Sequence, residues 1–246
     1  MSVGLKNKIK IAVIPARLNS VRLPKKILAE INGRPMAIHT ADQISKCKNI
    51  DRIILAIDDH ETYEALRGYD YELEMTSKDH QSGTDRIAEV VQRISNVDVV
   101  INIQADEPFI DPKIIDSLVD VFDSDGVRMA TAVSTKLYAN ELLDTNVVKA
   151  HVDKKLYAKK FSRVVGSNDD AKLELGGLYK HLGVYGFTKK MLLEFVSYNQ
   201  SENEKLLKLE QLRAIDNSVK IKVILTDQDC ISINTIEDLL DARGEG

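Results

Sequence analysis

Four cationic side chains follow directly on an apolar run near the start of the chain. The stretch KIAVIPARLNSVRLPKK, residues 10–26, turns from a buried-strand pattern into a loop that carries Arg17, Arg22, Lys25 and Lys26. Guanidinium groups grip phosphate oxygens in a bidentate manner, and an ammonium adds a compact charge. A solvated basic loop is the alternative, but the position behind a strand favours a polyphosphate ligand. The spacing matches neither a Walker P-loop nor a dinucleotide fingerprint.

Two further polar motifs carry residue types that bind nucleotides and metals. In SGTDR, residues 82–86, Ser82 can cap a helix and Gly83 allows a close backbone approach, although a plain helix cap would look the same. In NIQADEP, residues 102–108, Asp106 comes directly after an apolar run. A carboxylate there can hold Mg²⁺ together with phosphate oxygens, and a helix-capping Asp is the alternative.

The elements that must position these motifs alternate between strand and helix. Short β-branched runs predict strands at Ile11–Ala16, Arg52–Ile57, Tyr71–Met75 and Val97–Gln104. Helical patterns separate them at Pro35–Cys47, Glu61–Arg67 and Thr84–Ser95. This alternation predicts an α/β fold with a doubly wound, mostly parallel sheet. Because such sheets bind ligands at the carboxyl ends of their strands, we expect the polar loops to meet at one edge.

The second half of the chain is less regular. Strands are predicted at Met129–Thr135, Asn146–Val152, from Lys160, in YKHLGVYGF and at Lys220–Leu225. Helices are predicted at Lys189–Tyr198, at Glu202–Ala214 and from Thr235 onward. We expect a single domain, 1–246, in which residues 1–128 and 216–246 form the core and residues 129–215 form a smaller lobe on the core sheet.

Composition excludes several classes of function. The 246 residues carry a net charge of −4, whereas a nucleic-acid-binding protein usually has a basic excess. Cys47 and Cys230 are too few for a disulfide framework or a structural zinc site, which favours a reducing compartment. No apolar run approaches the roughly 18 residues of a membrane helix, and the first ten residues lack the apolar core of a secretory signal. We therefore expect a cytoplasmic protein with no membrane or nucleic-acid partner.

Eight motifs, taken in order, carry a resemblance to one family. IPARLNSVRLPKK, INGRPM, DHQSGTDRIAEV, NIQADEPFI, FSR, HLGVYGF, LEQLRA and INTIEDL span about Ile11 to Arg243. Their order resembles the 3-deoxy-manno-octulosonate cytidylyltransferases, or CMP-Kdo synthetases. The resemblance implies a Rossmann-like nucleotidyltransferase sandwich that couples CTP to the acidic eight-carbon sugar Kdo and releases pyrophosphate, for lipopolysaccharide synthesis. It also implies Mg²⁺ as cofactor, and a homodimer whose 129–215 lobe binds the sugar and the partner copy.

The resemblance implies a role for each matching position. The catalytic residues would be Arg17, Arg22, Lys25 and Asp106. The nucleotide would be bound by Ala16, Arg17, Arg22, Lys25, Ser82, Gly83, Arg86 and Gln104. The sugar would contact Arg163, His181, Tyr185, Glu210 and Gln211. The metal ligands would be Asp106 and Asn234.

Departures from the family pattern leave alternatives open. Asn234 stands where the family usually has a second metal-binding Asp, so weaker Mg²⁺ binding is expected unless Asp227, Asp229 or Asp238 compensates. Ala105 replaces a usual Gly, and the segment after FSR lacks the usual Ile-Pro. One alternative is a cytidylyltransferase for a modified octulosonate such as 8-amino-Kdo, with Glu202 or Glu204 facing the amino group, or for another acidic sugar. A non-catalytic nucleotide or sugar binder with a weakened metal site is the other.

Overall fold

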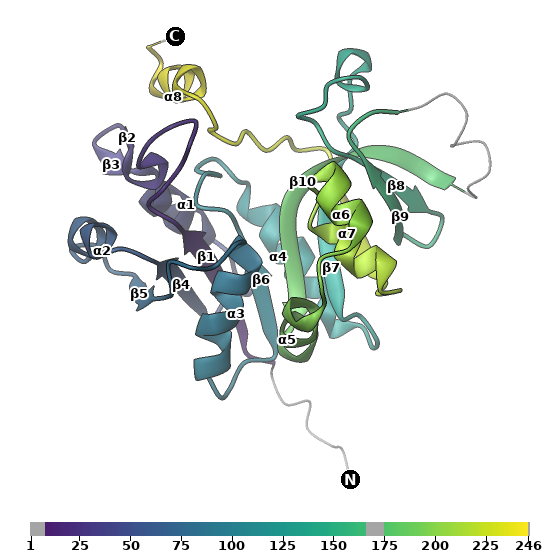
Figure 1. Cartoon of the computed structure of the whole chain (residues 1–246), viewed down its shortest axis with the longest axis horizontal. Helices are drawn as coiled ribbons and strands as arrows, with labels where there is room; N and C mark the ends of the chain where they lie inside the picture. Colours follow the sequence, from purple (N-terminus) through teal and green to yellow (C-terminus); the bar gives the residue numbers. More distant parts are fainter. Residues whose placement is uncertain (1–7, 166–174, 246) are drawn as a thin grey trace.

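A nine-stranded sheet runs through the centre of the protein. The computed structural model describes residues 8–165 and 175–245. The main path of the sheet has the order β11-β7-β10-β6-β1-β4-β5 (Figure 1). Its strands are β1 (Lys10–Ala16), β4 (Arg52–Ile57), β5 (Glu72–Met75), β6 (Val99–Asn102), β7 (Met129–Ser134), β10 (Leu175–Thr188) and β11 (Ile221–Thr226). Only β10 runs against its neighbours on this path, so the predicted mostly parallel α/β sheet is confirmed.

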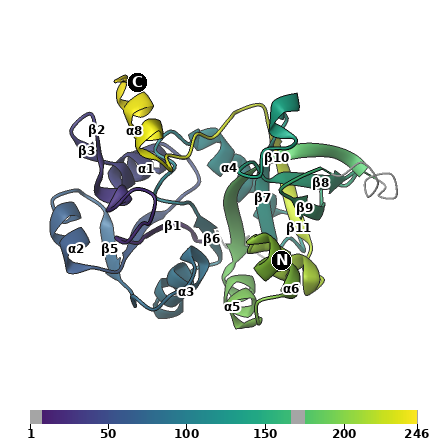
Figure 2. The same ribbon diagram turned by 45° about the horizontal axis from the view of Figure 1, so that its top comes forward.

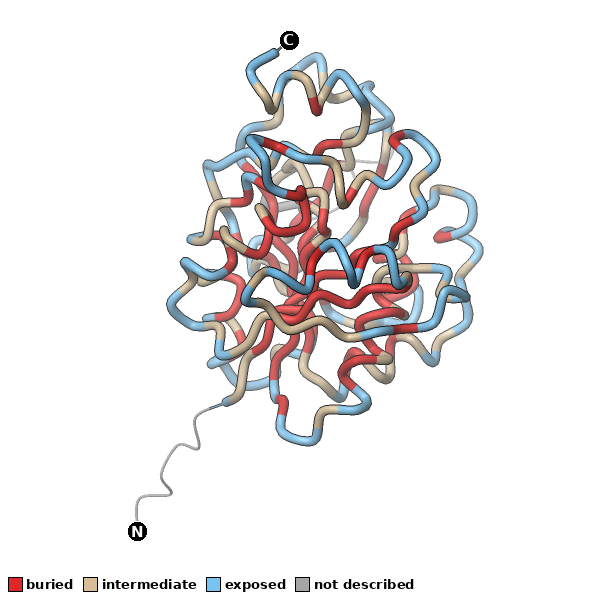
Figure 3. Tube along the Cα trace, turned by 90° about the vertical axis from the view of Figure 1, so that its left-hand side faces the viewer, coloured by how far each residue is buried: buried red, intermediate tan, exposed pale blue. Residues whose placement is uncertain are grey.

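Helices cover both faces of this sheet, as the strand sequences require. In β1, Ile11 and Val13 enter one core with α3 (Gly83–Arg93) and α5 (Lys189–Ser197), while Ala12 and Ile14 enter the other. The second core lies against α1 (Met36–Ile44), α2 (His60–Leu66) and α4 (Pro112–Asp120). Figure 2 shows the two layers of helices, and Figure 3 shows the buried strands between them. Strands buried on both faces account for the near-continuous apolar runs in the sequence.

The predicted 129–215 lobe shares the central sheet with the rest of the chain. β7 and β10 lie on the main path of the sheet, and the hairpin of β8 (Lys149–Asp153) and β9 (Ala158–Ser162) joins the sheet off this path, through β10 (Figure 1). The first half of β10 pairs with β8, and its second half pairs with β6 and β7. The division into core and lobe stays a prediction. The departure noted after FSR falls largely on residues 166–174, which lie outside the described residues.

One predicted helix is wrong, because two short helices replace Glu202–Ala214. They are α6 (Glu202–Leu207) and α7 (Gln211–Asp216), and Lys208 between them has a left-handed backbone with φ 52°. The Arg163 guanidinium donates hydrogen bonds to the carbonyl oxygens of Leu207 and Lys208. Those carbonyls would accept from the following turn in a continuous helix, so this tertiary contact compensates the break.

A small third core joins the first functional loop to the end of the chain. Leu23, Ile31, Met36, Ile233 and Leu239 pack together. They bring the hairpin of β2 (Glu30–Ile31) and β3 (Arg34–Pro35) against α8 (Ile236–Arg243), after the chain has crossed the sheet edge from β11 (Figure 1). Short 3₁₀ turns complete the elements at Lys26–Leu28, Val121–Asp123 and Ala139–Glu141. Within the described ranges, every helix is too short or too polar to span a bilayer.

Candidate active site

Several of the predicted site residues meet in one cavity beyond the carboxyl ends of β1 and β6. The cavity has a volume of about 300 Å³ and lies between the loop after β1, the loop after β6 and the segment before α8. The predicted residues that line it are Arg17, Arg22, Gln104, Asp106 and Asn234. Three distant parts of the sequence thus converge at the edge where a parallel sheet binds ligands.

The cationic loop contributes a different lysine from the one predicted. Lys26 lines the cavity together with Asn19 and Ser20, whereas Lys25 is not among the lining residues. Lys25 has a left-handed backbone and pairs instead with Glu61 of α2, with 2.5 Å between Nζ and Oε1. Residue type and spacing could not choose between two adjacent lysines. The backbone turn at Lys25, which points the two side chains apart, made the choice.

The two predicted metal ligands lie next to each other although 128 positions separate them. The Ile233 N–H donates to the Asp106 carbonyl oxygen at 3.0 Å, which joins the two loops. The Lys26 ammonium donates to Asp106 Oδ2 and lies 3.4 Å from Asn234 Oδ1. Asn234 Oδ1 also accepts from Arg22 Nη2 at 2.8 Å. A carboxylate and an amide oxygen therefore already share one cationic group.

This oxygen pair fits a divalent ion that draws its remaining ligands from elsewhere. Among residues 8–165 and 175–245, no group of three or more His, Cys, Asp or Glu side chains is placed to hold a metal. Mg²⁺ commonly uses one or two protein oxygens and completes its shell with substrate phosphates and water. Asp106 and Asn234 meet that minimal requirement, and the Lys26 ammonium marks where a cation is favoured.

The nearby aspartates have other partners and do not join this pair. Asp238 accepts the N–H groups of Asn234 and Thr235 at 2.7 and 2.8 Å, and so caps α8. Burial opposes ionisation of Asp238, but these backbone donors, the Thr235 side chain and the Arg22 charge together lower its pKa below the ordinary value. Asp229 pairs with Lys180 at 2.9 Å, and Asp227 accepts from the Gln228 amide. The segment before α8 is thus held in place by groups other than a metal.

The SGTDR motif lies behind the cavity wall and does not line the cavity itself. Ser82 Oγ accepts from the Asp85 N–H and caps α3. A Cβ at Gly83 would lie 3.0 Å from Pro15 Cγ and 3.3 Å from Gln104 Oε1, so glycine lets α3 approach the cavity wall. Neither residue lines the cavity, and Ala16 is buried in the core at the end of β1.

Arg86, predicted to contact the nucleotide, is buried and forms an ion pair. Its Nη2 lies 2.9 Å from Asp58 Oδ2, and its Nη1 donates to Thr76 Oγ1 at 2.5 Å. Asp58 accepts the Leu18 N–H at 3.0 Å through its other oxygen. Arg86 therefore acts on the cationic loop through Asp58, which holds the backbone next to Arg17.

The predicted sugar residues fall into a second, mostly buried group. His181 Nε2 lies 2.9 Å from Thr131 Oγ1, and its ring packs between Phe161 and Tyr185. Burial lowers the pKa of His181 to about 3, so the imidazole is neutral. Burial, followed by the nearby Glu210 charge, raises the pKa of Tyr185 well above its ordinary value. Both rings are neutral, and Tyr185 lies within reach of the Glu210 charge.

Arg163 and Glu210 differ in how many of their polar atoms have hydrogen-bond partners within the protein. The Arg163 guanidinium donates to the carbonyl oxygens of Leu207 and Thr145 at 2.7 Å each and of Lys208 at 3.1 Å. Glu210 Oε2 accepts from Thr84 Oγ1 at 2.6 Å, but its buried Oε1 has no hydrogen-bond partner in the described part of the chain. Burial raises the pKa of Glu210.

Gln211 is buried, and Glu210 Oε1, which has no hydrogen-bond partner among the described residues, lies 4.0 Å from the Arg213 guanidinium.

Sequence reasoning missed residues whose roles depend on contacts between distant segments. Glu107 is buried and accepts from Ser232 Oγ, and burial raises the pKa of Glu107 to about 8. This contact helps to hold the segment that carries Asn234. Thr84 and Asn102 belong to the motifs already noted, yet no pattern indicated that they contact each other. Their polar type inside apolar surroundings was the available signal.

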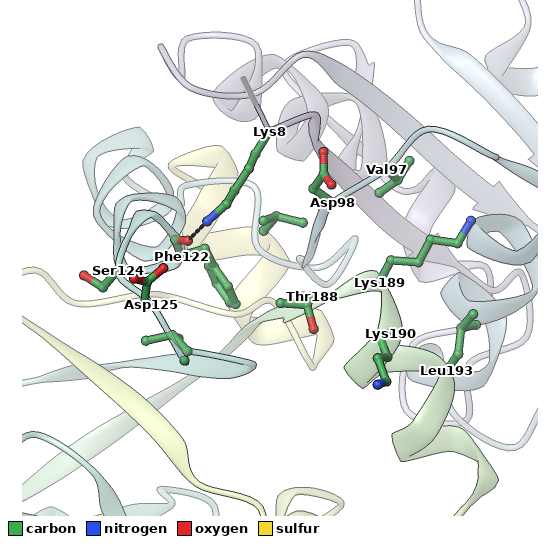
Figure 4. Close-up of a pocket in the computed structure, with 13 residues that line it drawn as sticks. Lys8, Val97, Asp98, Phe122, Ser124, Asp125, Thr188, Lys189, Lys190 and Leu193 are labelled. Carbon is green, nitrogen blue, oxygen red and sulfur yellow. Dashed lines mark hydrogen bonds between the residues drawn. The ribbon is translucent and has the colours of Figure 1, made fainter. Parts of the chain in front are cut away.

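A separate hollow of about 640 Å³ lies at the opposite end of β6 (Figure 4). Val97, Asp98 and Thr188 line it, and Lys8 extends across it to donate to the Phe122 carbonyl oxygen. None of the predicted site residues contributes to this hollow. The candidate site is therefore the cavity at the carboxyl ends of β1 and β6, where the motifs lie, and not this hollow.

Known proteins of one family share both the sequence and the fold. A family model described as cytidylyltransferase matches residues 11–221. A 3-deoxy-manno-octulosonate cytidylyltransferase of Geobacter sulfurreducens is 38% identical over 239 residues, covering 93% of this chain and 95% of the relative. The protein of that name from Thermodesulfovibrio yellowstonii is 37% identical over 243 residues, covering 94% and 95%.

Solved structures give the same grouping. The structure of CMP:2-keto-3-deoxy-manno-octonic acid synthetase complexed with CTP aligns with a TM-score of 0.88 and 29% identity, over 96% of this chain and 98% of that one. A 4-diphosphocytidyl-2C-methyl-D-erythritol synthase from Anaerococcus prevotii shares the fold, with a TM-score of 0.63, 18% identity and coverage of 97% and 96%. The chain belongs to the cytidylyltransferase family and, within it, to the 3-deoxy-manno-octulosonate cytidylyltransferases.

Proposed function

We propose that this protein transfers the CMP unit of CTP to Kdo and releases pyrophosphate. The observation that carries the proposal is the cavity in which Arg17, Arg22 and Lys26 face Asp106 and Asn234. Cations from one loop stand opposite an oxygen pair suited to a divalent ion, which is the arrangement that a nucleoside triphosphate requires. Relatives named for this reaction align over more than nine-tenths of the chain.

The reaction is a displacement at phosphorus. The anomeric hydroxyl of Kdo gives up its proton to water as its oxygen forms a bond to the α-phosphorus of CTP. The bond from that phosphorus to the bridging oxygen breaks, and pyrophosphate leaves with the electron pair. The triphosphate and the sugar carboxylate are both anions, so they repel each other. Arg17, Arg22 and Lys26 would neutralise the triphosphate and the negative charge that develops on the leaving group.

Mg²⁺ is part of the proposal, held by Asp106 and Asn234. When bound, the ion would neutralise phosphate oxygens and favour departure of pyrophosphate. The amide of Asn234 contributes no charge, so the protein offers one formal negative charge where two carboxylates would offer two. Lys26, which already contacts both oxygens, adds positive charge at the same place.

The test is pyrophosphate release from CTP in the presence of Mg²⁺, with Kdo and 8-amino-Kdo assayed side by side. The expected result is release that requires both CTP and the acid sugar, and much slower release with UTP in place of CTP. No release with either sugar, together with no measurable CTP affinity, would contradict the proposal. Binding of CTP without release would leave a nucleotide-binding protein as the function.

Glu210 Oε1 has no hydrogen-bond partner among the described residues and only a long ion pair with Arg213, so it favours a hydrogen-bond donor on the sugar, and an amino sugar would supply a charged one. The other carboxylates considered for this role have partners. Glu204 forms a buried ion pair with Arg213 at 2.6 Å, and the exposed Glu202 pairs with Lys205. The ratio of kcat/KM for 8-amino-Kdo and Kdo measures the preference, and Glu210→Gln should shift that ratio toward Kdo.

A homodimer and a cytoplasmic location complete the proposal. Tyr138, Leu143 and Val164 expose apolar surface within residues 129–215, and β9 is an edge strand that pairs with β8 alone among the described strands. Such a surface is suited to a second copy of the chain. Light scattering of the purified protein should give twice the chain mass, and Leu143→Asp should reduce it. CTP is made in the cytoplasm, which favours that compartment.

A further inference from the structure

A chain of side-chain hydrogen bonds connects the two groups of predicted substrate-binding residues. Gln104 Nε2 donates to Asn102 Oδ1 at 3.1 Å, and Asn102 Nδ2 donates to Thr84 Oγ1 at 3.3 Å. Thr84 Oγ1 then donates to Glu210 Oε2 at 2.6 Å. Gln104 lines the cavity with the cations, whereas Glu210 lies beside Tyr185. The four residues come from three distant segments, which meet at β6, the start of α3 and the start of α7 (Figure 1).

The negative charge of Glu210 at one end of this hydrogen-bond series determines which groups donate and which accept. A hydroxyl has a single proton, and Thr84 gives it to the Glu210 carboxylate, so the Thr84 oxygen accepts from Asn102. This orients the Asn102 amide, whose oxygen accepts from Gln104 Nε2. Gln104 is left with Oε1 as a free acceptor near Gly83 at the cavity wall. The state of Glu210 therefore affects which atom Gln104 presents.

Burial prevents water from replacing these bonds. Thr84 is 2% exposed and Asn102 is 1% exposed. In such surroundings hydrogen bonds to a charged group are strong, and a polar atom left without a partner is costly. Glu210 Oε1 has no hydrogen-bond partner in the described part of the chain, and its ion pair with Arg213 Nη2 is long, at 4.0 Å. A donor from a ligand would satisfy it and hold the carboxylate in one position.

We propose that Thr84 and Asn102 are positioning residues that couple the two substrate subsites. A hydroxyl or amino group of the sugar acid that donates to Glu210 Oε1 orders Glu210, Thr84, Asn102 and Gln104 together. CTP then binds a Gln104 side chain that is already oriented, so less ordering is required at that step. Coupling of this kind is reciprocal, and CTP tightens sugar binding by the same factor. The inference rests on the proposed function and gives a role to two motif residues, Thr84 and Asn102, to which the family resemblance assigned none.

The experiment measures how much Kdo tightens a CTP analogue that cannot react. The probe is cytidine 5′-[α,β-methylene]triphosphate with Mg²⁺, titrated calorimetrically with and without saturating Kdo. Kdo should tighten the analogue about 5-fold or more in the wild type. Thr84→Val, which keeps the shape and removes the hydroxyl, should bring that factor to about 1, while leaving the affinity without Kdo within about 2-fold.

Two variants separate positioning from folding. Thr84→Ser keeps the hydroxyl and should retain the wild-type factor. Thr62 on α2 is also fully buried, and its hydroxyl has no hydrogen-bond partner among the described residues, so Thr62→Val is the matched control. In that control, Kdo should still tighten binding of the analogue by the wild-type factor. Asn102→Leu replaces Asn102 with a side chain of similar volume. It interrupts the same series of hydrogen bonds at a second position, should Thr84→Val fail to fold.

The outcomes are distinct. A Thr84→Val or Asn102→Leu protein that keeps the wild-type factor would overturn the inference, and so would an equal loss in Thr62→Val. A wild type that binds the analogue equally with and without Kdo would overturn the inference but leave the proposed function standing. A wild type that does not bind the analogue would overturn both.

Discussion

The nucleotide side and the sugar side of the site present their polar groups in opposite ways. On the nucleotide side, Arg17 and Arg22 are exposed on a loop. Arg22 donates to the Asn234 amide oxygen, and its charge also acts on the Asp238 carboxylate. On the sugar side, Arg163 is saturated by main-chain carbonyls and His181 is buried against Thr131. Unsatisfied surface charge indicates a ligand directly. Buried polar groups bind other groups of the protein first, and within the described part of the sugar side Glu210 Oε1 lacks a hydrogen-bond donor and has only a long ion pair with Arg213.

The largest loss of activity should come from changing Asp106, which with Asn234 forms the proposed metal site. Asp106→Asn removes the only formal negative charge of the proposed metal site and should lower kcat/KM by about 100- to 1,000-fold, since charge placed at reacting phosphates contributes most of the rate. Steady-state pyrophosphate release measures it. Asp111→Asn is the matched control, because Asp111 caps α4 outside the cavity. Equal losses in both variants would show that Asp106 acts on folding alone.

The two adjacent lysines provide the sharpest test of the nucleotide side. Lys26→Ala should lower kcat/KM by about 100-fold, because it removes a cation from the cavity. Lys25→Ala should change it by less than about 3-fold, because Lys25 pairs with Glu61 at the surface. The same pyrophosphate assay compares them. A larger loss in Lys25→Ala would restore the assignment that the sequence suggested.

Arginine substitutions on the two sides should separate stability from function. Arg163→Ala leaves three carbonyl acceptors without their donor and should lower the free energy of unfolding by about 2–4 kcal/mol. Arg17→Ala should leave stability within about 0.5 kcal/mol, because the side chain is exposed. Urea denaturation measures both. A stable Arg163→Ala protein with a raised KM for Kdo would instead make Arg163 a sugar ligand.

The buried His181 should make stability depend on pH. Burial lowers its pKa to about 3 in the folded state, against 6.5 ordinarily, so the unfolded chain binds the extra proton between these values. Stability from this group is complete above pH 6.5 and is lost as pH falls toward 3, by at most about 1.4 kcal/mol per pH unit. Urea denaturation from pH 7 to 4.5 should show a shallower slope in His181→Gln. The exposed His60→Gln should keep the wild-type slope.

The smallest effect concerns Asn234. Restoring a carboxylate with Asn234→Asp should lower the Mg²⁺ concentration for half-maximal activity by about 3- to 10-fold, because Mg²⁺ binds a carboxylate more tightly than an amide. A titration of pyrophosphate release with Mg²⁺ measures the shift. Equal half-saturation in both proteins would mean that the amide is no handicap, or that Lys26 and Arg22 neutralise the new charge.

Much of the fold and of the nucleotide side could be predicted from the sequence. β1 and β4 were located to within one residue because strands buried on both faces are continuous apolar runs. The convergence of Arg17, Arg22, Asp106 and Gln104 followed from the rule that strand ends in a parallel sheet share an edge. The partners of Arg163 on the sugar side could not be predicted, because they are backbone carbonyls whose positions depend on the whole fold.

By itself the sequence determined the alternation of strands and helices, the cationic loop and the family, since each of these depends on local residue types and their order. Only the tertiary structure decided that Lys26 rather than Lys25 enters the cavity, that Arg163 holds the break between α6 and α7, and that Thr84 and Asn102 link Glu210 to Gln104. The physical reason is that a buried polar group takes whichever partner the packed fold brings within about 3 Å, and spacing along the chain does not contain that information.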